Sequence, residues 1–347
     1  MISVQNIYYM LAYAFQVLNE QGYKDIATEK FNNVGELCAK ILTKGIKIQL
    51  KRRLNKEYIA NKEALSSLRG RINITDSIKN QTILKKQMVC TFDDFSANTY
   101  LNQILKSTIK LLLLFEITKV IKNELRKLLV YFDGIDTLDV NTIDWKIVYN
   151  RNNQNYRMLI SICYLVVKGL LQTNSDGSTR LMDFFDEQRM SRLYEKFIFE
   201  YYRKEFNSII EVNASHIDWQ LDDENKLFLP IMKSDILLSK DDKVLIIDAK
   251  YYSKIVQTRY DAQTLHSGNL YQIFTYVKNK EVELIDEPHN VSGMLLYAKT
   301  DEVLSPDVSY SMSGNKIIVK TLDLNCDFGI ISQQLDAIVY EHILINR

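Results

Sequence analysis

Apolar residues recur with helical spacing through most of the first half of the chain. This pattern predicts helices over Asn6–Phe15, Val34–Leu50, Tyr100–Tyr131 and Arg157–Gln172. Residues 51–89 differ, because basic and apolar residues alternate there, and the run SSLRGRINI (Ser66–Ile74) is typical of a strand around a glycine turn. We therefore expect a mostly helical first half with a β-rich, basic insert at about residues 51–89.

The second half shows a different order of elements. It begins with an amphipathic helix whose apolar residues fall at i, i+3, i+4, i+7, i+8 and i+11, namely Met190, Leu193, Tyr194, Phe197, Ile198 and Tyr201. Strand-like runs follow at Leu227–Ser239, Lys243–Tyr252, Gly293–Ala298 and Lys316–Leu324, with further helices expected over Asn269–Lys278 and Ile330–Leu344. This order predicts an α/β sandwich around a mixed sheet.

A polar stretch separates the two halves. Thr173–Thr179 (TNSDGST) has the composition of a linker. A chain of 347 residues is long enough for two domains. We therefore expect one domain over residues 1–178 and a second over residues 179–347.

Composition narrows the range of functions. The formal net charge is +1, so no overall field attracts nucleic acid, and any such contact must come from local patches or a partner. No apolar stretch approaches the ~20 residues of a membrane helix. We see no secretory signal before the first cysteine. The four cysteines are too far apart in sequence to match the spacing of a metal site: Cys38, Cys90, Cys163 and Cys326. We expect reduced thiols in a cytoplasmic protein without a membrane partner.

One acidic–basic pair stands at the end of a strand that should be buried. Asp-or-Glu, any residue, Lys occurs four times in the chain, but only Asp248-Ala249-Lys250 follows a continuous apolar run, Val244–Ile247. Residues i and i+2 of a strand share a face, so Asp248 and Lys250 should point the same way. Buried charges are costly unless they are paired or bind a metal.

A second carboxylate is expected beside this pair. Asp235 lies on the preceding strand-like run, and the turn Lys240–Lys243 would bring it next to Asp248. Two adjacent carboxylates suit Mg²⁺, with a substrate phosphate completing the coordination, and Lys250 could stabilise charge during attack on phosphorus. The alternative is a structural salt-bridge network at a sheet edge, and these three residues alone do not decide between the two.

Two further elements carry polar residues that could join this cluster. Glu195 lies on the amphipathic helix, although an ordinary exposed glutamate is an equally good interpretation. Gln272 and Tyr276 are at i and i+4, on one face of the helix that follows the Lys250 strand. A glutamate, an aspartate, Asp-x-Lys and Gln-x-x-x-Tyr thus follow one another within about 80 residues. This ordered set is much less expected by chance than any one of its members.

These residues, in this order, resemble the PD-(D/E)xK nuclease superfamily, in its branch with a Gln-x-x-x-Tyr helix. Ser234 stands where proline is common, at a position that varies widely in the superfamily. Most of the chain is similar to the McrC family, the nuclease subunits of McrBC restriction systems. The similar runs are VQNIYYMLAYAF near the start, LRGRIN (Leu68–Asn73), LYEKF (Leu193–Phe197), and VLIIDAKYY followed by NLYQIFTY.

The resemblance implies a fold, ligands and partners. It implies a C-terminal PD-(D/E)xK-like α/β nuclease with a mixed sheet, and an N-terminal half that docks on a hexameric AAA+ GTPase, McrB. The implied catalytic residues are Asp235, Asp248, Lys250, Glu195, Gln272 and Tyr276. A pair of Mg²⁺ ions would be held by Asp235, Asp248 and the Ala249 backbone carbonyl. The implied substrate is double-stranded DNA modified at cytosine and recognised by the partner.

Other residues agree with a nuclease that depends on a separate motor. The chain contains no Gly-x-x-x-x-Gly-Lys-Ser/Thr, so we expect it to bind no nucleotide by itself. The scattered cysteines argue against an iron–sulfur nuclease. The four histidines, which show no metal-ligand spacing, are His216, His266, His289 and His342. Their spacing argues against a nuclease that binds its metal through histidine. We expect only His266 to lie near the site.

The basic insert is a candidate contact with the motor. It includes Arg69 and Arg71, and the resemblance implies that such a segment reaches into the motor ring and stimulates GTP hydrolysis. The alternatives are a solvated basic hairpin or one that touches DNA phosphates.

Three functions therefore remain under comparison. The first is a Mg²⁺-dependent DNA endonuclease subunit of a GTP-driven restriction complex. The second is a stand-alone repair nuclease, and the third is a catalytically idle adaptor that only activates a GTPase. The absent motor counts against the second, and the filled catalytic positions count against the third.

Overall fold

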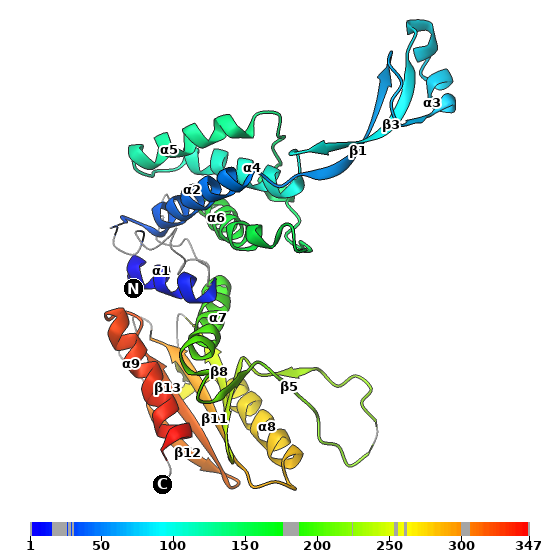
Figure 1. Ribbon diagram of the computed structural model, residues 1–347. Helices are drawn as coiled ribbons and strands as arrows, with labels where there is room; N and C mark the ends of the chain where they lie inside the picture. The colour runs from blue at the N-terminus through cyan, green and yellow to red at the C-terminus, as the bar shows by residue number, and fades with distance from the viewer. Residues whose placement is uncertain are drawn as a thin grey trace. The chain divides into compact units, whose positions relative to one another are not determined.

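The computed structural model describes residues 2–15, 26, 29, 31–175, 187–223, 225–252, 256–259, 262–299 and 306–345. The chain forms two compact units (Figure 1). The helical unit comprises Gly35–Phe184, and the sheet unit combines Met1–Val34 with Phe185–Arg347. The boundary expected at residues 178 and 179 lies outside the described residues.

The helical unit is built from α2 (Val34–Arg52), α4 (Tyr100–Leu114), α5 (Lys119–Leu129) and α6 (Arg157–Ser175), joined by short 3₁₀ turns at Val130–Phe132, Val140–Thr142 and Gln154–Tyr156. α4 packs against both α5 and α6. The core of the helical unit is formed by fully buried side chains, among them Leu37, Ile41, Leu105, Leu125 and Val166. The helices expected over Val34–Leu50 and Arg157–Gln172 are present here, whereas the one expected over Tyr100–Tyr131 is not continuous.

The single helix expected over Tyr100–Tyr131 is wrong, because the chain breaks between α4 and α5. Phe115 is extended at the end of α4. The buried carboxylate of Glu36 then accepts a hydrogen bond from the backbone nitrogen of Thr118 at 2.9 Å. This tertiary contact satisfies an amide at the start of α5 and so stabilises the break, which helical periodicity alone does not reveal.

The insert is a long antiparallel hairpin with additions at its end. β1 (Glu57–Leu65) pairs with β3 (Met88–Ser96), and β2 (Arg71–Ile72) pairs with the other edge of β3. α3 (Ile74–Lys79) and the 3₁₀ turn Thr82–Lys85 complete it. Gly70 has φ +67°, and a Cβ there would collide with the Thr91 carbonyl oxygen, so the glycine turn is required. The β structure extends to Ser96, beyond the expected end at residue 89.

The sheet unit contains a six-stranded mixed sheet with the order β12-β13-β11-β8-β7-β4. Its strands are β4 (Glu211–Asn213), β7 (Ile236–Lys240), β8 (Lys243–Lys250), β11 (Asn290–Ala298), β12 (Val308–Met312) and β13 (Asn315–Leu322). β8, β11 and β13 run parallel, whereas β7 is antiparallel to β8. Two small antiparallel pairs lie outside this sheet: β5 (His216–Ile217) with β6 (Met232–Lys233), and β9 (Val256–Arg259) with β10 (Ala262–Leu265).

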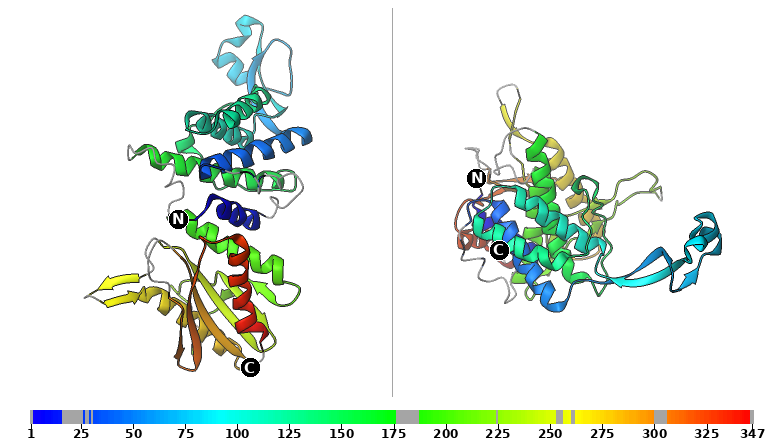
Figure 2. Two further views of the ribbon diagram at one scale, coloured as in Figure 1. Left: turned by 90° about the vertical axis from the view of Figure 1, so that its left-hand side faces the viewer. Right: turned by 90° about the horizontal axis from the view of Figure 1, so that it is seen from above.

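Helices cover both faces of this sheet (Figures 1 and 2). α8 (Ser267–Glu283) lies on one face, and α9 (Phe328–Val339), extended by a π-helical turn at Tyr340–Leu344, lies on the other. α7 (Glu187–Phe206) is joined to α9 by a hydrogen bond from the Tyr202 hydroxyl to the Leu335 carbonyl oxygen. All six residues of the expected apolar face of α7 are buried, which confirms that amphipathic helix.

α1 (Val4–Ala14) belongs to the sheet unit, so the expected domain of residues 1–178 is corrected at its start. The Tyr9 ring stacks on Phe328 with centroids 4.2 Å apart, and Tyr13 packs on Tyr201 at 5.1 Å. Asn6 Nδ2 donates to the Leu324 carbonyl oxygen at 2.7 Å. These partners come from the far end of the sequence, so local pattern could not indicate them.

The expected strand over Leu227–Ser239 is also partly wrong. Residues 227–231 form an exposed loop in which Phe228 has φ +65°, a left-handed conformation that interrupts a strand. β7 begins only at Ile236. Edge strand β12 was not expected, although its sequence VSYSM alternates apolar and polar residues; its first four residues are exposed, as is usual at a sheet edge.

Two expectations from composition can be compared with the structure. None of the helices in the described ranges is long and apolar enough to cross a membrane. Cys38, Cys90, Cys163 and Cys326 are free thiols. Burial raises the pKa of Cys38 and Cys163 to about 12, so these thiols are unreactive at neutral pH.

Candidate active site at the junction of β7, β8 and α8

Asp235 lies directly opposite the end of β8. β7 and β8 are antiparallel with Ile236 paired to Ile247, so the residue before β7 reaches the level of Asp248. The backbone nitrogen of Ala249 donates to Asp235 Oδ2 at 2.9 Å and continues the strand ladder through a side chain. The short turn after Lys240 therefore places the two carboxylates side by side, as the sequence pattern predicts.

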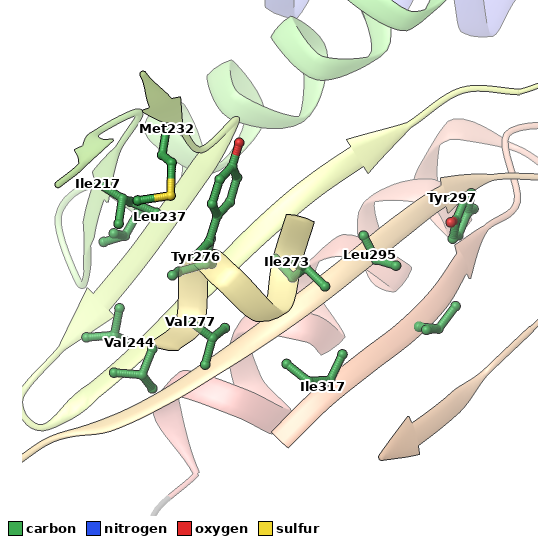
Figure 3. Close-up of a cluster of buried hydrophobic side chains, with 13 residues drawn as sticks. Ile217, Met232, Leu237, Val244, Ile273, Tyr276, Val277, Leu295, Tyr297 and Ile317 are labelled. Atoms are coloured by element: carbon green, nitrogen blue, oxygen red, sulfur yellow. The ribbon is translucent and has the colours of Figure 1, made fainter. Parts of the chain in front are cut away.

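Asp248 and Lys250 share the face of the sheet that α8 covers. Ile246 and Val244, two and four residues before Asp248 on that face, belong to one buried cluster with Ile273 and Val277 of α8. Figure 3 shows Val244 beside these α8 side chains. Strand alternation then directs Asp248 and Lys250 to the same side. The Lys250 ammonium lies 2.8 Å from Asp248 Oδ2. The apolar part of the strand thus anchors a charged end.

α8 supplies the next two polar groups. The Lys250 ammonium donates to Gln272 Oε1 at 3.3 Å, and Gln272 Nε2 donates to the Tyr276 hydroxyl at 2.9 Å. Gln272 and Tyr276 are one helical turn apart and therefore meet on one face. The result is a continuous polar chain from Asp248 through Lys250 and Gln272 to Tyr276.

The carboxylates are held in an environment that disfavours their charge. Burial raises the pKa of Asp248 to about 7, and the neighbouring Asp235 adds to the effect, while Lys250 opposes it. Burial likewise raises the pKa of Asp235, and the hydrogen bond from Ala249 opposes that rise. Without a further cation, the pair therefore retains protons above the usual range of a carboxyl group.

Lys250 remains charged in this setting. Its burial alone would lower its pKa, but the Asp248 carboxylate and then Asp235 outweigh that effect and raise the pKa above its ordinary value. The side chain is only 16% exposed. An ammonium fixed in this way is a permanent positive charge, so Lys250 is not available as a neutral base at physiological pH.

Glu195 approaches the cluster without joining its hydrogen bonds. It is half-buried on α7 and accepts a hydrogen bond from the Ser191 hydroxyl at 2.9 Å. Burial, and then the charge of Asp235, raise the pKa of Glu195. The structure therefore places Glu195 within electrostatic reach of Asp235 and Lys250, as a separate carboxylate beside the pair.

The donor set suits a divalent cation, although it is incomplete. In the described part of the chain, no group of three or more His, Cys, Asp or Glu side chains is arranged to hold a metal. Two carboxylates and one carbonyl are present. Asp248 Oδ2 is buried, and the Lys250 ammonium at 2.8 Å makes no well-aligned hydrogen bond with it. An oxygen of this kind is available to a cation.

The Ala249 carbonyl adds a third oxygen. In a strand, the N–H and C=O of one residue point to the same side. The Ala249 N–H points to Asp235, so its carbonyl is directed toward β7 beyond the point where that strand begins. Oxygen ligands from two carboxylates and one carbonyl match the preference of Mg²⁺, which keeps its other positions for water or phosphate.

Two residues beside the site escaped the sequence pattern. Tyr297 of β11 is the register neighbour of Lys250, and its hydroxyl accepts a hydrogen bond from Asn269 Nδ2 at 2.9 Å. Asn269 precedes Gln272 by three residues and so shares its face of α8, which is the only signal that could have found it. His266 packs on Tyr252 at 5.1 Å between ring centroids, consistent with a bystander.

Arg69 and Arg71 belong to the insert of the helical unit, not to this cluster. The Arg69 guanidinium lies 4.5 Å from the Phe92 ring centroid, and its nitrogen is 3.4 Å from Asp94 Oδ1. Arg71 is exposed on β2. Both arginines are therefore presented on the surface of the insert.

Comparisons with known proteins cover nearly the whole chain. Residues 3–298 match the family model described as McrBC 5-methylcytosine restriction system component. The type IV methyl-directed restriction enzyme EcoKMcrBC of Escherichia coli (strain K12) is 32% identical over a 349-residue alignment that covers 99% of this chain and 98% of that protein.

Two solved structures are also similar in part. A half-complex from a tetradecameric assembly of Thermococcus gammatolerans McrB AAA+ hexamers with bound McrC has a TM-score of 0.48 at 15% identity, covering 94% of this chain and 75% of that chain. A cryo-EM structure of the Thermococcus gammatolerans McrBC complex has a TM-score of 0.40 at 17% identity, covering 57% and 56%.

Proposed function

Because this chain belongs to the family of McrBC 5-methylcytosine restriction system components, we propose that it is the DNA-cutting subunit of a GTP-driven restriction complex. The observation that carries the proposal is the cluster of Asp235, Asp248 and Lys250 at the ends of β7 and β8, with Gln272 from α8. The cleavage reaction would be hydrolysis of a phosphodiester bond.

The topology supports a nuclease of the PD-(D/E)xK type. The chain runs from α7 through the antiparallel pair β7 and β8 to α8, and then to β11, which is parallel to β8. The two carboxylates and the lysine occupy the end of the central hairpin, and the Gln-x-x-x-Tyr residues come from the following helix. This matches the order that the sequence resemblance implies.

Asp235, Asp248 and the Ala249 carbonyl would hold Mg²⁺, with Glu195 as the carboxylate nearest to a second ion. When bound, the metal would polarise a phosphoryl oxygen and lower the pKa of a water molecule. The protein's own part is to hold the oxygens rigidly on strands and to keep Lys250 charged. Lys250 would stabilise the negative charge that develops on the phosphoryl group during attack.

Gln272 and Tyr276 would act by position. Gln272 accepts from Lys250 and is itself oriented by Tyr276, so the ammonium is constrained from two sides. Without Gln272, the ammonium would keep its 2.8 Å contact with Asp248 but lose its second partner on α8. The polar chain therefore keeps the positive charge near the place where substrate phosphate would lie.

The partner is proposed to be an McrB-like AAA+ GTPase hexamer. The relative from Thermococcus gammatolerans is seen with such hexamers, and this chain lacks a Gly-x-x-x-x-Gly-Lys-Ser/Thr sequence of its own. The exposed insert, with Arg69 and Arg71, would contact that motor and stimulate GTP hydrolysis. Double-stranded DNA with modified cytosine would be the substrate, selected by the partner.

The two alternative functions are less well supported. An adaptor that only activates a GTPase has no use for a buried Asp248 beside a second carboxylate, Asp235, both with raised pKa values, because burying a carboxylate costs stability unless it is paired or binds a metal. A stand-alone repair nuclease leaves the helical unit and its long insert without a role. The restriction subunit accounts for both units of the chain.

The test is plasmid cleavage by the full chain assembled with the AAA+ protein encoded beside it. Cleavage is measured with GTP, with ATP and without nucleotide, each with Mg²⁺ or EDTA. We expect cleavage only with GTP and Mg²⁺, and none with the Asp248→Asn chain. GTP-dependent cleavage that survives Asp248→Asn would show that the cut is made elsewhere.

A further inference from the structure

A row of lysines lies along the exposed side of α2. Lys40, Lys44 and Lys47 fall at i, i+4 and i+7, so one face of the helix carries all three, while Leu37, Ile41 and neighbouring residues face the core. No large apolar residue of α2 is among the exposed ones of the described chain. The outer face of this helix is therefore mainly cationic and polar, with the half-buried Ile48 one turn after Lys44.

α5 carries a second cationic face. Lys119, Lys122 and Arg126 fall at i, i+3 and i+7 and, with Asn123, Glu116 and Ile117, line a hollow of about 620 Å³. Among the described residues, no carboxylate forms an ion pair with Lys119, Lys122 or Arg126. The Arg126 guanidinium donates only to Asn123 Oδ1, at 3.0 Å. The hollow therefore holds three cations against one carboxylate, that of Glu116.

Glu124 joins the two helices into one surface. Its carboxylate lies 2.7 Å from the Lys47 ammonium and 3.8 Å from that of Lys40. The hydrogen bond from Lys47, with the charges of Lys40 and Lys127, lowers its pKa, so it stays ionised. This single carboxylate holds the lysines of α2 against α5 without cancelling their charge.

The surface defined by these residues is strongly positive in a nearly neutral protein. The α2–α5 basic surface comprises seven cations and two carboxylates, whereas the whole chain has a net charge of +1. The members are Lys40, Lys44, Lys47, Lys119, Lys122, Arg126 and Lys127, with Glu116 and Glu124. Such separation of charge produces a local field that a polyanion can follow.

We infer that the α2–α5 basic surface binds the phosphodiester backbone of DNA, as a contact separate from the nuclease site. The inference rests on the proposed function only in taking DNA as the polyanion. Lysine and arginine that neutralise phosphates supply most of the affinity for DNA of any sequence. A protein partner fits less well, because the cores of protein interfaces are depleted in lysine and enriched in apolar residues.

The contact would give a nuclease with a net charge of only +1 a grip on DNA. Without metal, the cluster around Asp235 and Asp248 offers phosphate only the ammonium of Lys250, which Asp248 already engages at 2.8 Å, so most of the retention of DNA must come from elsewhere. A lysine-rich surface that reads no bases would hold DNA of any sequence. This suits an enzyme whose target is chosen by its partner.

The test compares two charge-reversed forms of the full chain. Lys119→Glu with Lys122→Glu removes two cations from the hollow. Glutamate near a helix N-terminus, and four residues before Arg126, favours α5, so folding should be retained. The matched control, Lys240→Glu with Lys316→Glu, makes the same change of charge at the end of the sheet opposite to Asp248 and Lys250.

Binding of a fluorescent 30-base-pair duplex is measured by anisotropy in EDTA over a series of KCl concentrations. EDTA prevents cleavage, so the result is independent of whether the metal site is correctly assigned. We expect the hollow variant to bind about tenfold or more weakly at 50 mM KCl, and its slope of log K against log salt to fall by about two. The control should stay within about twofold of the wild type.

Three outcomes would overturn the inference. The first is no measurable binding by the wild-type chain at low salt, and the second is an equal loss in the control. The third is unchanged DNA binding with lost stimulation of the AAA+ GTPase, which would assign this surface to the motor. Acetylation of Lys119 and Lys122, mapped by mass spectrometry with and without duplex, provides a direct check, because bound DNA should protect both.

Discussion

The ammonium of Lys250 is shared between Asp248 on its own strand, at 2.8 Å, and Gln272 on the facing helix, at 3.3 Å. A lysine in a purely structural ion pair needs only the first contact. The second fixes the direction of the ammonium, which lies between the carboxylate pair and α8. Several consequences of this arrangement can be measured.

Lys250→Ala should lower the single-turnover rate of DNA cleavage by about a hundredfold to a thousandfold, because it removes a charge that acts as negative charge develops. Mg²⁺ affinity, measured by calorimetry, should change much less. Lys250→Arg should restore little activity, since a planar guanidinium does not reproduce a compact ammonium. Equal losses of metal binding and cleavage would make Lys250 a structural partner of Asp248.

Asp248→Asn should abolish cleavage and leave the fold intact. In EDTA it should also change how stability depends on pH. The folded-state pKa of Asp248 is raised from 3.8 to about 7, so protonation favours the folded state, and that stability is lost as pH rises from about 4 to about 7. The thermal midpoint of the wild type should therefore fall over this window more steeply than that of Asp248→Asn.

Added Mg²⁺ provides the control for that experiment. A cation held by Asp235 and Asp248 favours their ionised forms, so the extra fall of the wild type should disappear in Mg²⁺ and return with EDTA. If the plots of thermal midpoint against pH for the wild type and Asp248→Asn instead coincide in EDTA, the pKa of Asp248 in the folded protein is that of an ordinary carboxyl group. The carboxylate pair would then not be a poised metal site.

Arg69 and Arg71 should contribute to stimulation of the partner's GTPase, but unequally. Arg71 is exposed on β2, whereas Arg69 is already engaged with Phe92 and Asp94. Arg71→Ala should lower the stimulated GTP hydrolysis rate without altering the thermal midpoint of the chain. Arg69→Ala should lower both, since it also removes a cation–π contact. Stimulation that survives the double substitution would move the trigger to another part of the insert.

Asn6→Ala should destabilise the sheet unit although it lies at the opposite end of the sequence. Asn6 Nδ2 donates to the Leu324 carbonyl at 2.7 Å and to that of Cys326 at 2.8 Å. Loss of a buried donor that satisfies backbone carbonyls costs about 1–3 kcal/mol in the free energy of unfolding. Urea unfolding measures this, with the exposed Asn207→Ala as control. If the two variants unfold at the same urea concentration, α1 does not stabilise the sheet unit through Asn6.

The central hairpin could be predicted from the sequence because its signals are local. The two-residue period placed Asp248 and Lys250 on one face, and the turn after Lys240 brought Asp235 beside them. The helical period likewise placed Gln272 with Tyr276. The position of Glu195 relative to the pair could not be deduced, since no periodicity fixes the distance between α7 and β8. The roles of these residues in cleavage stay predictions.

Long-range contacts account for most of what the sequence did not reveal. The end of α4 depends on Glu36, a residue far earlier in the chain that captures the Thr118 amide. The link between Asn269 and Tyr297 joins α8 to β11 and has no local signature. The membership of α1 depends on Phe328 and Leu324, near the other end of the chain. Propensity carries no information about such pairings.

The docking of α1 on elements from the end of the chain makes the sheet unit late to assemble during synthesis. The helical unit lies between α1 and α7 in the sequence, and its local contacts allow it to form first. At about 5–20 residues per second, the ribosome needs roughly 10–35 s to reach α7 after making α1. The stacking of Tyr9 on Phe328 can form only later, when the ribosome has made residue 328. A chain released before β11 is made lacks the strand that pairs with β8 on the side away from β7, so the candidate site is complete only when translation is almost finished.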